Sequence, residues 1–193
     1  MFFYFLDISF YGIMYLPTFF SVRNLSLELS GMISFGLTIF NLTQILLKPI
    51  SFLALSRAVY NKNNDTKYTF IAVVIYSKFS AFVLFFSTDL IIHYFLGADF
   101  LKVSFLIKLI SFAVLLFGVF LCLRSTIDAL FDMAINSLNC FIALISFLSI
   151  YYSLTFFNVN EVYNILIPFI ISLNILSIRT VLILYKYFKR LLP

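Results

Sequence analysis

A row of regularly spaced charges lies between two long apolar runs, in residues 122–139. Arg124, Asp128 and Asp132 stand four residues apart, and on a helix this spacing places the three side chains along one face. We therefore predict that Arg124 and Asp128 form an ion pair. A short cytoplasmic connection between two membrane spans would by itself account for each single charge. The spacing thus predicts a structural role for the pair.

Asp89 and His93 form a second pair at helical spacing, inside an apolar stretch. Ionisable groups within a membrane span are costly and tend to mark transport pathways, so the two residues are candidates for a proton relay. The alternative is a polar pair close to the outer membrane surface, satisfied by water. Their position near the end of the stretch favours this alternative, because burial costs least there.

Several cations also lie within or near the apolar stretches. If Lys48 and Arg179 face one cavity, they would attract an anionic group such as a diphosphate, so we treat them as candidate substrate-binding residues. We expect Lys78 and Lys108 to extend along the apolar surface to the nearer membrane face. Asp7 lies deep in the first stretch and needs a partner or water.

The sequence lacks the motifs of the common catalytic and metal sites. It contains one histidine and no Gly-rich phosphate loop, HExxH or GxSxG motif. Cys122 and Cys140 have no cluster of His, Asp or Glu near them, which indicates buried thiols and neither a disulfide framework nor a metal site. We expect no enzymatic activity, no metal and no cofactor.

The composition is that of an integral membrane protein. Hydrophobic residues make up 63% of the 193 residues, charged residues make up 11%, and the mean hydropathy is +1.10. A soluble protein must cover its surface with polar groups, whereas the outside of a membrane protein faces lipid. The net charge of +5 lies in short loops and at the C-terminus, so it indicates membrane orientation and no nucleic-acid partner.

We predict an all-α fold, a single transmembrane bundle of six helices that occupies residues 1–193. The expected spans are about 1–22, 31–60, 69–97, 101–123, 138–157 and 162–185. Cations concentrate on one side of these spans, at Arg57, Arg124 and the segment 186–190 among others. The positive-inside rule makes that side cytoplasmic. The chain is then a multi-pass protein of the cytoplasmic membrane with both termini inside.

Several short segments, in order along the chain, carry a resemblance to a known family. They are Gly31-Met-Ile-Ser-Phe-Gly-Leu-Thr with the later Lys48-Pro49 and Leu55-Ser-Arg57, then Leu96-Gly-Ala-Asp-Phe100, then Leu123-Arg-Ser-Thr-Ile-Asp-Ala129 followed by Asn136. The last is similar to a segment of the form R-S-x-x-D-A. With these segments the chain resembles the C-terminal half of O-antigen-type flippases, the polysaccharide biosynthesis proteins of the multidrug/oligosaccharidyl-lipid/polysaccharide exporter superfamily.

The resemblance implies a transporter that moves polyprenyl-diphosphate-linked oligosaccharides across the cytoplasmic membrane for O-antigen or capsule synthesis. Such transporters use alternating access between two six-helix bundles. One bundle implies a truncated or split form, and the implied partners are the lipid-linked oligosaccharide, membrane lipids and a second six-helix half or a homodimer. The alternatives are half of a multidrug-type exporter, a non-transporting membrane subunit or scaffold, and a remnant.

Overall fold

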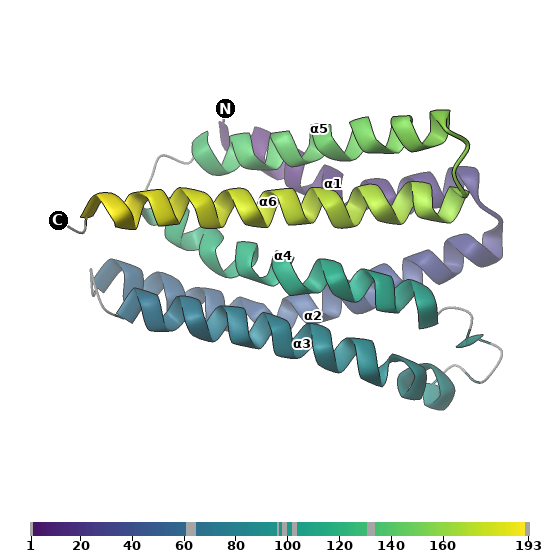
Figure 1. Cartoon of the computed structure of the whole chain (residues 1–193), viewed down its shortest axis with the longest axis horizontal. Coiled ribbons are helices and arrows are strands. Elements are labelled where there is room, and N and C mark those ends of the chain that lie inside the picture. Colours follow the sequence, from purple (N-terminus) through teal and green to yellow (C-terminus); the bar gives the residue numbers. More distant parts are fainter. Residues whose placement is uncertain are drawn as a thin grey trace.

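The protein folds into six α-helices, as a computed structural model of the chain shows (Figure 1). Their bounds are α1 (Phe2–Asn24), α2 (Leu27–Tyr60), α3 (Asp65–Phe95), α4 (Ser104–Leu130), α5 (Ala134–Phe156) and α6 (Glu161–Leu191). The residues that the structure describes contain no strand. The prediction of an all-α chain with six helices is therefore confirmed.

The structure describes the backbone of the chain except for residues 1, 61–64, 96, 98–99, 102–103, 131–133 and 192–193. It describes fewer side chains. The side chains outside the description are those of residues 1–7, 46, 48, 51, 54–55, 57–70, 95–96, 98–99, 102–103, 115–116, 125–126, 129–134 and 187–193.

The helices run alongside one another in alternating directions (Figure 1). One end of the bundle collects the ends of α1, α3 and α5 and the beginnings of α2, α4 and α6. We call this the Asn24 end. The opposite end, where α4 ends and α5 begins, we call the Arg124 end. The charged row of the sequence therefore lies at the Arg124 end.

Local capping explains where the helices stop and start at the Asn24 end. The Ser26 hydroxyl accepts a hydrogen bond from the Leu29 amide, and the Asn160 side chain accepts one from the Val162 amide. Both are N-cap interactions, which satisfy amides that the first turn of a helix leaves free. Asn158, which follows α5, has a φ of 52°, and the Val159 amide bonds back to the Leu154 carbonyl. This arrangement is a Schellman-type C-cap.

Helix α4 is the centre of the bundle, because it packs against α2, α3 and α6. Gly118 permits the close approach of α4 to α2 and α3. A Cβ atom added at Gly118 would lie 2.5 Å from Ser77 Oγ of α3 and 2.8 Å from Leu47 Cδ1 of α2. Phe40 of α2 meets Phe117 of α4 and Phe169 of α6, at centroid distances of 5.5 and 5.4 Å. Aromatic packing of this kind contributes beyond the buried area alone, so the three helices are held as one core.

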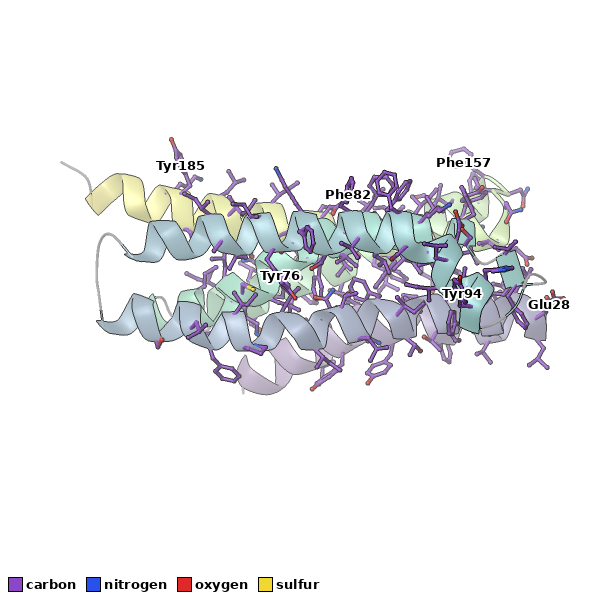
Figure 2. The ribbon with its side chains drawn as sticks, turned by 90° about the horizontal axis from the view of Figure 1, so that it is seen from below. Glu28, Tyr76, Phe82, Tyr94, Phe157 and Tyr185 are labelled. Atoms are coloured by element: carbon purple, nitrogen blue, oxygen red, sulfur yellow. The ribbon has the colours of Figure 1, made fainter. Side chains whose placement is uncertain are left out.

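Four helices are long and apolar enough to cross a membrane, within the part of the chain that the structure describes. Their apolar stretches are Ile71–Tyr94 in α3, Ser104–Arg124 in α4, Ile135–Phe156 in α5 and Glu161–Lys186 in α6. These helices indicate a multi-pass membrane protein. Large apolar side chains on the outside fit a lipid environment, and Phe82, Phe157 and Tyr185 project from the surface (Figure 2). The spans expected in α1 and α2 stay predictions.

Two of the three charges in the row lie within a helix and not in a connection between spans. We placed the ends of the neighbouring spans at 123 and 138, but α4 runs to Leu130 and α5 begins at Ala134. Arg124 and Asp128 are thus helical residues at the end of α4. Asp132, the third member of the row, lies outside the described residues.

Candidate functional site

A polar network at the Arg124 end joins α4 to α5. Arg124 Nε lies 3.9 Å from Asp128 Oδ2, so the pairing expected from the spacing is present. Asn136 Nδ2 donates to Asp128 Oδ1 at 2.7 Å and to the Arg124 carbonyl at 3.1 Å. Asn136 is fully buried, so its amide spans the gap between the helices without competition from water. The three residues named in the R-S-x-x-D-A resemblance thus lie in one network.

Helix α1 also contributes to this network. The Arg124 guanidinium carbon lies 5.2 Å from the centre of the Phe10 ring. A guanidinium at this distance from an aromatic face is attracted by the ring quadrupole. Arg124 is consequently held by a ring on α1 and by a carboxylate on its own helix. The arrangement fits the predicted structural role.

Arg179 lies on α6 and has a different environment from Arg124. Its Nε donates to Asn139 Oδ1 at 3.1 Å, and Asn139 is 1% exposed. No carboxylate in the described part of the chain forms an ion pair with Arg179. The buried amide holds the inner nitrogen of the guanidinium, and the two terminal nitrogens are the groups that bind carboxylate or phosphate bidentately. Arg179 can therefore act as an anion-binding residue.

The buried amides near these residues have further bonding capacity. Asn136 Oδ1, Asn139 Nδ2 and Asn174 Oδ1 are buried without a hydrogen-bond partner among the described residues. Asn136 and Asn139 are one helical turn apart on α5, so they connect the Arg124 pair on α4 with Arg179 on α6. Such partly satisfied amides are costly and are often found where a structure rearranges or binds a ligand.

The charges near the Asn24 end pair differently from the relay considered in the sequence. Lys108 Nζ donates to Asp89 Oδ2 at 2.6 Å, and the Ser104 hydroxyl donates to the same carboxylate. No hydrogen bond joins Asp89 to His93 in the described residues. His93 is exposed, and its ring contacts the ring of Tyr94 edge to face. The proposed partner within one helix is thus replaced by partners on the next helix.

Lys108 has partners that the snorkelling expectation did not include. Besides pairing with Asp89, its Nζ lies 5.9 Å from the centre of the Phe85 ring. The sequence alone does not show that α3 brings a carboxylate and a ring to the first turns of α4. Lys78 is exposed. The side chains of Lys48 and Asp7 lie outside the described residues, so their predicted roles stay predictions.

A pocket at the Asn24 end was not predicted from the sequence. Its volume is about 480 Å³, and it lies between the end of α1, the end of α5 and the beginning of α6. The polar and aromatic residues in its wall include Arg23, Asn24, Tyr151, Tyr152, Glu161 and Asn164. Polar residues at three separate helix ends resemble ordinary loop residues in a sequence. Only the packing of the helices shows that they share one wall.

Within the described residues, no group of three or more His, Cys, Asp or Glu side chains is placed to hold a metal ion. Comparison of the chain with protein-family models, with curated proteins and with solved structures gives no match. The features of the chain that bear on its function are therefore the apolar helices, the polar network and the resemblance of the short motifs.

Proposed function

We propose that the chain is one half of a membrane transporter, a flippase that moves polyprenyl-diphosphate-linked oligosaccharides from the cytoplasmic to the outer leaflet. All six helices would cross the membrane, with both termini in the cytoplasm and the Arg124 end facing inward. No covalent bond of the substrate would change. The protein would lower the barrier by giving the charged headgroup and its sugars a polar route past the hydrocarbon.

The environment of Arg179 is the observation that carries this proposal. The guanidinium is half-buried in a helix of membrane-spanning length, and the buried Asn139 orients it. A permanent positive charge without a carboxylate partner is expensive next to lipid, so such residues mark sites that bind ions or substrates. A diphosphate presents the paired oxygens that a guanidinium binds best.

The Arg124–Asp128–Asn136 network supports the proposal in a second way. Its residues are those that resemble a segment of the exporter superfamily, and the network ties α4 to α5 close to Arg179. In an alternating-access cycle the helices of one bundle must move together. A buried amide that links two helices favours such rigid-body motion.

Surface display of a glycan tests the proposal. A host that lacks its own exporter of a lipid-linked glycan would express this chain alone, and then together with a six-helix partner half. We expect export only with the partner, because one bundle forms one wall of the cavity. Export by this chain alone would contradict the split form and indicate a homodimer. Absence of export in both cases, with both chains verified in the membrane and a matching glycan supplied, would contradict the transporter proposal.

The Arg179→Gln variant sharpens the assay. It keeps a group that can bond to Asn139 and removes the charge, so we expect export to fall about tenfold, which corresponds to the loss of one charge-assisted hydrogen bond. Arg179→Lys should recover part of the export. Lys78→Gln serves as the control, since Lys78 is an exposed cation outside the network. Equal export by Arg179→Gln and Lys78→Gln would remove Arg179 from the substrate route.

A further inference from the structure

The pocket between α1, α5 and α6 has an ordered wall. The rings of Phe20 and Tyr151 stack with centroids 4.1 Å apart and an interplanar angle of 18°. Asn24 Nδ2 donates to the Tyr151 hydroxyl at 2.6 Å, which joins the end of α1 to α5. Tyr151 is buried and Tyr152 is exposed beside it. A hollow supported by stacked rings and a hydrogen bond between helices is preformed, as small-molecule sites usually are.

One charge of each sign faces this hollow. Arg23 lies at the end of α1 and Glu161 at the beginning of α6, and both line the pocket. They form no ion pair with each other, and no other ion pair of the described residues includes either of them. Separated opposite charges on two walls of one pocket are complementary to a zwitterion. An anion would be drawn to Arg23 and an amine to Glu161.

A third polar group in the wall lacks a partner. Asn164 is 6% exposed, and its Nδ2 donates to the Val159 carbonyl at 3.0 Å. Its Oδ1 has no hydrogen-bond partner in the described part of the protein. The Oδ1 atom itself is closed to solvent, so Asn164 helps to shape the wall, and the groups that can contact a ligand are Arg23 and Glu161. Asn164 lies one turn after Glu161 on α6, so the carboxylate and the amide stand on one side of the pocket.

We propose that this pocket binds the phosphoethanolamine group of a membrane lipid. The phosphate would bind the Arg23 guanidinium, and the ammonium group would donate to Glu161. A volume of about 480 Å³ is within the range of small-molecule sites and accommodates this headgroup. The proposal does not depend on the transported substrate, since the pocket lies at the opposite end of the bundle from Arg124.

The level of the pocket in the membrane favours a lipid over a dissolved zwitterion. Thr155 in its wall lies next to the end of the apolar stretch Ile135–Phe156, and Glu161 begins the stretch Glu161–Lys186. The pocket therefore sits where the hydrocarbon core ends, at the level of the lipid headgroups. Tyr152 and the exposed Phe19 stand at this level, where aromatic side chains are enriched in membrane proteins.

Native mass spectrometry of the full chain in detergent tests the proposal by lipid titration. The probes are phosphatidylethanolamine, phosphatidylcholine and phosphatidylglycerol with identical acyl chains. We expect phosphatidylethanolamine to bind at least fivefold more tightly than the other two. Phosphatidylcholine has no N–H to donate, and phosphatidylglycerol has no cation. Equal affinities for the three lipids would overturn the proposal.

Variants separate the two halves of the headgroup. Glu161→Gln should reduce phosphatidylethanolamine binding to the level of phosphatidylglycerol, and Arg23→Gln should weaken the binding of all three lipids. Glu28→Gln is the matched control, because Glu28 is an exposed acid at the same end but outside the pocket wall. The helix content measured by far-ultraviolet circular dichroism would verify that each variant is folded. Loss of the lipid preference in Glu28→Gln, or its retention in Glu161→Gln, would contradict the assignment.

A competition arm identifies the source of the headgroup. Soluble glycerophosphoethanolamine should displace the lipid only at concentrations at least a hundredfold above that of the lipid, because it lacks the acyl chains that partition into the apolar surroundings. Displacement at a concentration comparable with that of the lipid would overturn the lipid assignment and indicate a dissolved zwitterion.

Discussion

The two ends of α4 stabilise their charges in different ways. At the Asn24 end, Lys108 reaches across to Asp89 on α3 at 2.6 Å, and the side chains are 28% and 53% exposed. At the Arg124 end, Arg124 and Asp128 belong to one helix, stand 3.9 Å apart and are 26% and 27% exposed. There the short contact is the 2.7 Å bond from the buried Asn136 amide. The Asn24 end joins α3 to α4 by an ion pair, and the Arg124 end joins α4 to α5 by the Asn136 amide.

This difference changes what each residue contributes. An ion pair in a partly exposed position gains little, because solvent screens it and the side chains lose conformational freedom. A buried amide that bonds a carboxylate contributes more, since its removal leaves a polar group without a partner. We therefore expect the neutral Asn136 to contribute more to the stability of the Arg124 end than the Arg124–Asp128 ion pair does.

Asn136→Leu should have the largest effect. It removes the donor to Asp128 and to the Arg124 carbonyl, so we expect the free energy of unfolding to fall by about 1–3 kcal/mol. Titration of the detergent-solubilised protein with a denaturing detergent would measure it. Asn41→Leu is the matched control, because Asn41 is an exposed residue of α2. Equal losses from the two substitutions would show that the amide linkage contributes nothing.

Lys108→Met should have a smaller effect. Asp89 loses its cation but keeps the Ser104 hydroxyl and its partial exposure, so we expect a loss of about 0.5–1 kcal/mol by the same titration. Adding Asp89→Asn should recover most of the loss, since it removes the unpaired charge. Lys78→Met, at an exposed position of α3, is the control. A loss above that for Asn136→Leu would reverse the order of the two ends.

The coupling between Arg124 and Asp128 should be smaller again. A double-mutant cycle with Arg124→Ala and Asp128→Ala should give an interaction free energy of about 0.5 kcal/mol, because the pair is long and partly exposed. Each single variant should still lower the folded yield in detergent, and exchanging the two residues should recover part of it. Strictly additive losses would mean that the pair contributes no stability.

His93→Gln should change the free energy of unfolding by less than about 0.5 kcal/mol, as expected for an exposed side chain outside the pair. Transport that depends on pH in the native protein and loses this dependence in the variant would contradict our interpretation. That result would restore His93 to a proton relay with Asp89.

Sequence spacing predicted the Arg124–Asp128 ion pair, which lies within one helix. The Arg124–Asp128 pair follows from the i, i+4 spacing, and the six helices follow from the alternation of apolar stretches and polar segments. The Asp89–Lys108 pair could not be predicted in the same way. Its residues are 19 positions apart, and their contact depends on how α3 and α4 rotate against each other. The spacing suggested His93 because only neighbours within a helix can be read from it.

The partner of Arg179 could not be predicted from spacing either. Asn139 and Arg179 are 40 positions apart, on helices that face each other only after α5 and α6 have packed. An asparagine inside an apolar run was a usable signal that a polar partner must exist, since a buried amide needs one. The spacing gave no indication of which residue that partner is.

The central position of α4 also determines an order of assembly during synthesis. The ribosome makes α2 and α3 before α4, so two of the three helices that pack most extensively against it are present when Ser104–Leu130 emerges. The other of these three, α6, is the last of the six helices to be made. Until it arrives, one face of α4 meets lipid and Asn139 lacks the Arg179 guanidinium. The nascent bundle is therefore an open trough, and translation of the final helix is the step that closes it.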